Sequence, residues 1–234
     1  MVIKEKLQVK ISAEKLYKRK LLTRVSSLVV ASSLLILGIL YVMLYIVNKT
    51  GNFTISLDPN LKTTKNIVMS ETSTFETSSS ILKVKALEYM DNITESWIPT
   101  TVTIDEGDHS ANDYLAYTFF IKNEGEETVD YYREIRIQSV IKNVDKAVRI
   151  ALYVNDVKTV YAKLAENGSP EPGTTPFLSR DLVLKDNRDV FAPGDVDKYT
   201  VVVWLEGEDP ECVDDIIGGE MKMLMQIKEQ IKGN

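Results

Sequence analysis

The chain has 234 residues, of which 44% are hydrophobic and 26% charged, and its net charge is −6. A single cysteine, Cys212, excludes an intrachain disulfide, so an exported domain of this chain must fold on its packed core alone. The acidic balance argues against nucleic acid as a partner, because phosphate binding needs a basic face.

A run of 23 residues without a charged side chain, from Val25 to Val47, follows a basic N-terminal segment. As a helix, the run is long enough to cross the roughly 30 Å hydrocarbon core of a bilayer. Residues 1–24 hold eight Lys or Arg against two acidic residues, which leaves −12 on the remainder. The positive-inside rule therefore predicts a single-pass cell-membrane protein with a cytoplasmic N-terminus, a span at 25–47 in the lipid bilayer, and an extracytoplasmic C-terminal domain.

A cleaved signal peptide is the alternative interpretation of this segment. The apolar region of such a peptide usually has about 7–15 residues and ends at a site of small residues. The run here is longer, and its outer end, Tyr41 to Asn48, offers no such site. We therefore predict an uncleaved signal-anchor, a short linker at 48–51 and one domain over 52–234.

The rest of the chain is rich in strand patterns. Alternation of apolar and polar residues predicts a strand over Asn52–Leu57, with Phe53, Ile55 and Leu57 toward the core. Further segments of β-branched and aromatic residues lie at Ile81–Tyr89, Tyr114–Ile121, Val129–Ile141, Val148–Val154, Val160–Lys163, Tyr199–Leu205 and Glu220–Lys228.

Several of these segments carry a finer expectation. Asn155-Asp156 predicts a hairpin turn, and the near-continuous apolar run Tyr199–Leu205 predicts a strand buried on both faces. Polar stretches at 71–80 and 168–176 are expected to be loops, with short helical turns near 143–148 and 211–217. In Val129–Ile141 one face is expected to hold alternate residues, namely Tyr131, Arg133, Ile135, Ile137, Ser139 and Ile141.

Many short strands with turns every 8–12 residues and little helical periodicity indicate a mainly β fold. We predict a single N-terminal transmembrane helix followed by an antiparallel β-sandwich domain of the jelly-roll or immunoglobulin-like kind.

The sequence contains no metalloprotease, nucleophile-elbow or phosphate-loop motif, so we predict no catalytic residue, no cofactor and no enzyme. The only histidine, His109, is expected to be an exposed loop residue. Trp204 is expected in the core, whereas Trp97 is left open between a buried and an exposed position.

Carboxylates gather in two places, at 105–108 and at 206–220, and calcium takes six to eight such oxygens. Neither stretch has EF-hand spacing, so a solvated acidic loop is the preferred interpretation. If a metal binds, its candidate ligands are Glu208, Asp209, Glu211 and Asp214.

Three stretches carry a resemblance to a known group of proteins. They are Gly51 to Leu57 (GNFTISL), Phe120 to Gly125 (FIKNEG), and Phe191 to Asp197 (FAPGDVD) followed by Trp204 to Cys212 (WLEGEDPEC). With an N-terminal export segment before them, this layout resembles the TasA/camelysin group of Firmicutes surface proteins. The resemblance implies a biofilm-matrix or cell-surface protein, fibre-forming in TasA by donation of an N-terminal strand. In that group the export segment is normally removed, whereas here it looks retained.

Three hypotheses for the function follow. The first is a non-catalytic surface protein that contacts other surface or matrix proteins, including copies of itself, through its sandwich faces or by strand exchange. The second is a metal-dependent ectoenzyme that uses the acidic loop at 206–220. The third is an accessory for signalling or surface assembly whose basic cytoplasmic segment contacts a partner or anionic lipid. The absence of catalytic motifs favours the first.

Overall fold

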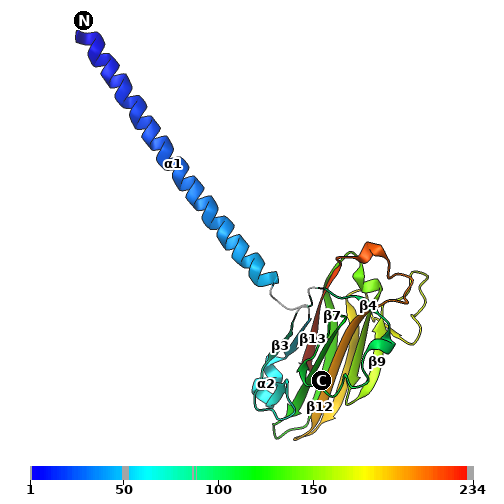
Figure 1. Ribbon diagram of the computed structural model, residues 1–234. Helices are drawn as coiled ribbons and strands as arrows, with labels where there is room; N and C mark the ends of the chain where they lie inside the picture. Colours follow the sequence, from blue (N-terminus) through cyan, green and yellow to red (C-terminus); the bar gives the residue numbers. More distant parts are fainter. Residues whose placement is uncertain (1, 49–52, 86, 88, 231–234) are drawn as a thin grey trace. The chain divides into compact units, whose positions relative to one another are not determined.

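The computed structural model describes residues 2–48, 53–85, 87 and 89–230 (Figure 1). The chain divides into two compact units, residues 1–50 and 51–234. The first contains helix α1 (Val2–Asn48), which is long and apolar enough over Ser12–Val42 to cross a membrane. Of the predicted linker at 48–51, Asn48 belongs to α1 and residues 49–51 lie outside the described part of the chain.

Every side chain of α1 from 12 to 42 is exposed. Its serine hydroxyls are nevertheless satisfied within the helix. Ser26, Ser27, Ser32 and Ser33 each donate to the carbonyl three residues earlier, at 2.8–3.0 Å. Such back-bonding keeps polar side chains compatible with a hydrocarbon environment.

The regular structure of the second unit consists mainly of strands. It also contains helix α2 (Pro59–Lys65) and three short 3-10 turns, η1 (Glu95–Trp97), η2 (Val144–Lys146) and η3 (Asp214–Ile216). The strands are β1 (Phe53–Leu57), β2 (Ile67–Ser70), β3 (Ile81–Val84), β4 (Asn92–Ile93), β5 (Gly107–Asp108), β6 (Tyr114–Asn123), β7 (Val129–Ile141), β8 (Val148–Val154), β9 (Val157–Ala162), β10 (Thr175–Pro176), β11 (Leu182–Phe191), β12 (Val196–Glu206) and β13 (Glu220–Glu229).

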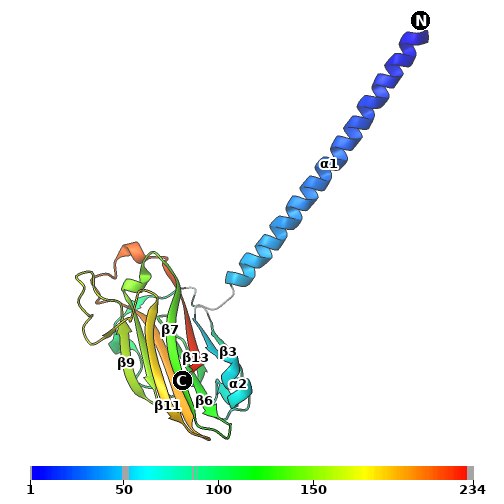
Figure 2. The same ribbon diagram turned by 180° about the vertical axis from the view of Figure 1, so that it is seen from behind.

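These strands form two sheets that enclose one core (Figures 1 and 2). The five-stranded sheet has the order β11-β7-β13-β1-β3, and the other runs β10-β9-β8-β12-β6-β2, with β4 beside β12 and β5 beside β6. Ile55 and Ile135 of the first sheet and Tyr117 and Val201 of the second belong to the same buried cluster. The predicted mainly β sandwich is confirmed, although the pairs β1–β13, β4–β12 and β9–β10 are parallel.

Strand β1 lies inside its sheet, parallel to β13 on one side and antiparallel to β3 on the other. Phe53, Ile55 and Leu57 are at most 3% exposed, while Thr54 and Ser56 point away from the core, as predicted. The alternation of the sequence is therefore the alternation of a strand with one buried face.

The eight-stranded sheet is covered on both faces. Its outer face carries a second buried cluster that includes Trp204, Val202 and Ala116. Ile93 and Val102, from the segment between β3 and β6, belong to the same cluster. This double burial explains why β12 is a near-continuous apolar run, and it confirms that Trp204 is a core residue.

The two ends of β7 differ in which residues they bury. The predicted inward face holds from Tyr131 to Ile137, but Ser139 and Ile141 are exposed. A β-bulge lies between the pairs Ile137–Met223 and Ser139–Lys222, and it moves Val140 to the inward side. One extra residue reverses the alternation, and the sequence pattern alone does not reveal it.

The predicted hairpin is confirmed, with Asn155 (φ 49°) and Asp156 (φ 67°) joining β8 to β9. Two positive φ values are those of a type I′ turn, which Asn and Asp tolerate. Strand β9 begins at Val157, three residues before the predicted start at Val160.

Other predicted bounds need correction. The strand predicted over 81–89 ends at Val84, because the next N–H, from Lys85, donates to Asp108 Oδ2 (3.0 Å) instead of continuing a ladder. The expected helix near 143–148 is the single turn η2, and the loop at 168–176 ends in β10.

A buried polar network joins the two sheets. The Tyr131 hydroxyl donates to Asp197 Oδ2 (2.6 Å), and Tyr199 therefore donates its own proton to the Tyr131 oxygen (2.6 Å). Arg188 Nε and Asn155 Nδ2 also donate to Asp197, at 2.9 and 3.0 Å. Asp197 is 1% exposed, so these donors replace water around its charge.

On the outer face of the five-stranded sheet, Glu134 is 2% exposed between Arg136 (Nε, 3.1 Å) and Lys228 (Nζ, 2.8 Å). Its burial opposes ionisation, but the hydrogen bonds and charges of the two partners outweigh it and lower the Glu134 pKa. A lowered pKa adds stability above the ordinary carboxyl range, and that stability is lost as pH falls through the folded-state value.

We expect Glu134→Gln to lower the free energy of unfolding by about 1–3 kcal/mol at pH 7. The difference from the parent should shrink toward zero below about pH 4. Urea titrations at several pH values would measure it. Glu124→Gln, which removes the surface pair with Lys122, is the control and should change stability by less than about 1 kcal/mol. A Glu134 effect that did not vary with pH would contradict the assignment.

Candidate functional site

A pocket of about 850 Å³ lies where three loops meet beside β8 and β12. The loops are those around η1, between β9 and β10, and after β12. Carboxylates dominate its lining, and they are Glu95, Glu166, Glu171, Glu206, Glu208, Asp209 and Glu211. The described lining contains one cationic side chain, Arg149.

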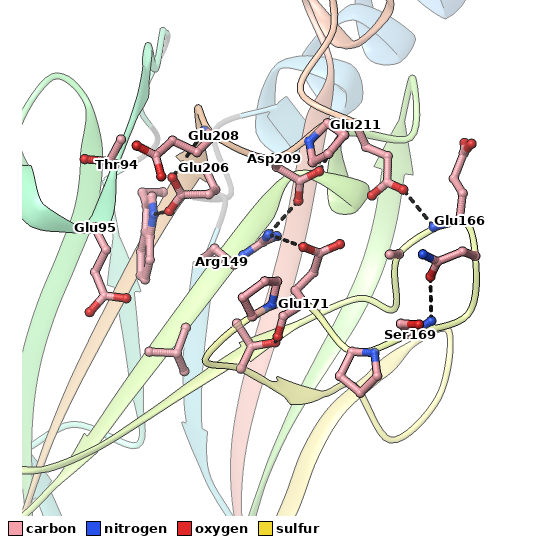
Figure 3. Close-up of a pocket in the computed structure, with 18 of the residues that line it drawn as sticks. Thr94, Glu95, Arg149, Glu166, Ser169, Glu171, Glu206, Glu208, Asp209 and Glu211 are labelled. Carbon is pink, nitrogen blue, oxygen red and sulfur yellow. Dashed lines mark hydrogen bonds and ion pairs between the residues drawn. The ribbon is translucent and has the colours of Figure 1, made fainter.

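Arg149 lies in the apolar strand β8, next to Trp204 of β12, and is 4% exposed. Its Nη2 donates to Asp209 Oδ2 (2.6 Å) and to Glu171 Oε2 (3.2 Å) (Figure 3). Figure 3 shows the guanidinium between these carboxylates, which reach it from two different loops. Arg149 thus fastens the loop after β12 to the loop before β10.

Asp209 and Glu211 also hold backbone groups of these loops. Asp209 Oδ1 accepts the N–H of Glu211 (2.7 Å), which closes a local turn. Glu211 Oε1 accepts the N–H of Glu166 (2.7 Å), which links this turn to the loop after β9. Both carboxylates are therefore already structural hydrogen-bond acceptors.

The electrostatics of the pocket follow from the excess of carboxylates over cations. Burial raises the pKa of Glu171, and the charges of Asp209 and Glu211 raise it further against the opposing effect of Arg149. Burial also raises the pKa of the Cys212 thiol, with Asp209 and Glu206 adding to the effect. A raised pKa disfavours the thiolate, so Cys212 lacks the environment of a reactive cysteine.

One donor of the Arg149 guanidinium is unmatched. Arg149 Nη1 is buried and has no hydrogen-bond partner among the described residues. A buried polar group without a partner costs about 1–3 kcal/mol, so Nη1 weakens the net contribution of this ion pair to stability.

The structure brings together only part of the metal-ligand set predicted from sequence. Asp209 and Glu211 have carboxylate oxygens within 4.8 Å of each other and of Glu171, which sequence reasoning did not select. Glu208 and Asp214 lie outside this group of three, and Asp214 is an exposed residue that opens η3.

The structure also places the other residues that were considered from the sequence, namely His109, the acidic stretch at 105–108 and Trp97. His109 is half-buried, not exposed as predicted, with Nδ1 2.9 Å from the Gly107 carbonyl and Nε2 2.8 Å from that of Val102. In the acidic stretch at 105–108, Glu106 accepts the N–H of Ser73. Trp97, left open from sequence, is 71% exposed.

No protein-family model and no curated protein matches the chain. Solved structures that align with it include two of a β-glucosidase from Kluyveromyces marxianus (14% and 13% identity), one of them in complex with glucose, and the N-terminal domain of PorA (8%). The alignments cover 71%, 72% and 72% of this chain, and 15%, 17% and 99% of those chains. The chain thus spans about a sixth of the glucosidase. All three have a TM-score of 0.25, which is too low to support a shared fold or function.

Proposed function

We propose that this chain is a single-pass, membrane-anchored protein of the bacterial cell surface that acts without catalysis, through contacts of its β domain with other surface or matrix proteins. The observation that carries the proposal is the apolar stretch of helix α1, with basic residues in the N-terminal half of the same helix and an acidic domain after it. The charge difference supports an outward-facing domain.

The position of β1 supports a domain kept close to the bilayer. It begins at Phe53, five residues after α1 ends at Asn48, so the connecting chain reaches at most about 18 Å. Because β1 is paired on both sides and its apolar side chains are buried, donating it to a neighbour would require opening the sheet.

One sheet edge, formed by β11, also favours contacts between folded surfaces over strand exchange. The edge strand β11 has register shifts at both ends and carries charged residues such as Lys185 and Arg188. Bulges and charges are the devices by which edge strands avoid pairing with other chains. The resemblance to the TasA/camelysin group implies assembly by donation of an N-terminal strand, and the two-sided pairing of β1 disfavours such an exchange here.

The metal-dependent ectoenzyme is the second candidate, and the cluster of Glu171, Asp209 and Glu211 favours it. Arg149 argues against it, because a guanidinium already lies between two of these carboxylates. A metal assay on the purified chain, with Glu171→Gln plus Glu211→Gln as the comparison, separates the two candidates. Stoichiometric bound metal that the double substitution removes would favour the ectoenzyme.

Protease treatment of intact cells tests the topology. With one epitope tag at each end, we expect the C-terminal tag to disappear and the N-terminal tag to remain, because residues 1–24 lie inside. Permeabilised cells, in which both tags should be lost, are the control. Survival of both tags in intact cells would overturn the topology, and with it the surface function.

Photo-cross-linking tests the proposed contacts in the same cells. A photoreactive residue at the exposed Val157 or Leu178 should give adducts of discrete mass, whereas one at the buried Ile135 should give none. Equal labelling at all three positions would count against specific contacts.

A further inference from the structure

The outer face of the five-stranded sheet is basic, although the β domain as a whole is acidic. Residues 51–234 contain 19 Lys or Arg against 32 acidic residues. In the paired body of this sheet, the register places one carboxylate, Glu134, on the outer face together with five cations, which are Lys83, Arg136, Lys185, Lys222 and Lys228. The other carboxylates of these strands that lie toward this side, Asp130, Asp189 and Glu220, are at strand ends.

Most of this positive charge is available to a ligand. Glu134 is 2% exposed and lies between Arg136 and Lys228, so its own charge is already matched. Among the described residues, Lys83, Lys185 and Lys222 form no ion pair, and the Lys185 ammonium lies 4.3 Å from the ring centre of Tyr132. An anionic partner would therefore meet three unpaired ammonium groups on one side of the sheet.

Exposed apolar side chains lie among these cations. Ile81 is 55% exposed on β3, two residues before Lys83 on the same face. Ile141 is 49% exposed at the end of β7, two residues after Ser139, which pairs with Lys222. Lysines beside exposed apolar side chains are typical of surfaces that rest on anionic headgroups and insert their apolar groups between them. Protein interfaces are instead depleted in lysine, so the composition favours lipid over a protein partner.

The connection to α1 places this same sheet beside a bilayer. Strand β1 belongs to the five-stranded sheet, and Thr54 and Ser56 lie on its outer face between β13 and β3. The chain between Asn48 and Phe53 reaches at most about 18 Å. Five strands about 4.8 Å apart make a face about 19 Å wide. The whole basic face can therefore reach the membrane surface when the domain lies on this side.

We propose that the outer face of the five-stranded sheet docks on the anionic lipid headgroups of the bilayer that holds α1. Lys83, Lys185 and Lys222 pair with headgroup phosphates, and Ile81 and Ile141 enter the headgroup layer. The inference rests on the membrane anchor of the proposed function. It leaves the eight-stranded sheet turned away from the bilayer and open to the proposed protein contacts.

Quenching of a fluorophore by lipid tests the docking. The full-length chain, with Cys212→Ala and a single labelled cysteine at Gln226→Cys in the middle of the face, is placed in nanodiscs that contain a headgroup nitroxide lipid. We expect stronger quenching in discs with about one-third phosphatidylglycerol than in discs of phosphatidylcholine alone, and loss of the difference near 1 M salt, where the Debye length is about 3 Å. A label at Val157→Cys, on the other sheet, should show no such difference.

Lys83→Gln plus Lys222→Gln is the diagnostic variant, because neither lysine belongs to an ion pair that the fold would lose. Each lysine near an anionic surface strengthens association by about fivefold, so the docked-to-undocked ratio should fall by about tenfold or more. The matched control is Lys158→Gln plus Lys198→Gln, which removes the same charge from the eight-stranded sheet. It should leave the quenching of the Gln226 label unchanged.

The inference fails if the Gln226 label is quenched equally in neutral and anionic discs, or if the two double variants act alike. It also fails if the label responds to soluble polyglutamate but not to anionic lipid, which would assign the face to an acidic protein or polymer. Co-elution of the chain with the discs is measured separately. A chain that does not enter discs would refute the anchor itself, whereas an inserted chain without quenching refutes only the docking.

Discussion

Replacing Asp197 with alanine should lower the free energy of unfolding of the β domain by about 3–5 kcal/mol. Asp197 is 1% exposed and accepts from Tyr131, Arg188 and Asn155 at 2.6–3.0 Å. Its removal leaves the buried Tyr131 hydroxyl without its acceptor and Arg188 without its most buried counter-charge. Guanidinium chloride unfolding of the detergent-solubilised chain, followed by near-UV circular dichroism, would measure the loss.

Two further variants make this prediction specific. Asp197→Asn keeps one acceptor oxygen but not the charge, and it should cost less than the alanine variant. Glu127→Gln removes an exposed pair with Lys65 and should cost less than about 1 kcal/mol. If Asp197→Ala were no more costly than Glu127→Gln, the network would not contribute to stability as its burial indicates.

Placing proline at Ile55 should prevent the β domain from folding, or destabilise it by about 3 kcal/mol or more. The cause is the interior position of β1, in which the backbone N–H groups face either β13 or β3. Proline cannot donate to a ladder, and central strands exclude it. Limited proteolysis and near-UV circular dichroism of the solubilised chain would show the loss of the fold.

Ile55→Val is the matched control for this substitution. It keeps the backbone donor and removes a single methylene from a fully buried side chain, so it should cost only about 0.5–1.5 kcal/mol. Equal effects of the two substitutions would mean that packing, and not the ladder, explains the sensitivity. A folded Ile55→Pro chain would show that β1 is dispensable.

Local patterns predicted eight of the strands because most of these bury one face or both, but they did not predict β2, β11 or the two-residue strands β4, β5 and β10. The alternation in β1 and the apolar run in β12 each follow directly from burial. Strand pairing did not follow, because the parallel contact of β1 with β13 joins residues about 170 positions apart. The bulge in β7 was likewise invisible, since it depends on how β13 aligns beside it.

Helix α2 was missed, although its signals are present in the sequence. Asp58 caps its first turn by accepting the N–H of Asn60 (2.9 Å), and Pro59 follows at the first helical position. Asn66 ends the helix in the left-handed conformation. These are ordinary start and stop residues, but the helix is only seven residues long and shows little periodicity.

The site was half predictable. The density of carboxylates after β12 pointed to Asp209 and Glu211, but Glu171 lies in a Pro/Gly-rich loop about 40 positions earlier. The available signal was Arg149, a charged residue inside the apolar strand β8. A buried guanidinium requires a paired carboxylate, so an arginine inside an apolar strand predicts a buried ion pair.

The parallel pairing of the first and last strands has a mechanical consequence. Tension applied between helix α1 and the C-terminal end of β13 pulls β1 and β13 in opposite directions along their length. The pairs from Phe53–Met223 to Leu57–Ile227 then resist in shear, all at once, whereas an antiparallel hairpin pulled from its open end separates one pair at a time. Because β1 is also bonded to β3, a pull on α1 strains two ladders simultaneously. The pairing therefore opposes unfolding when the two ends of the domain are pulled apart.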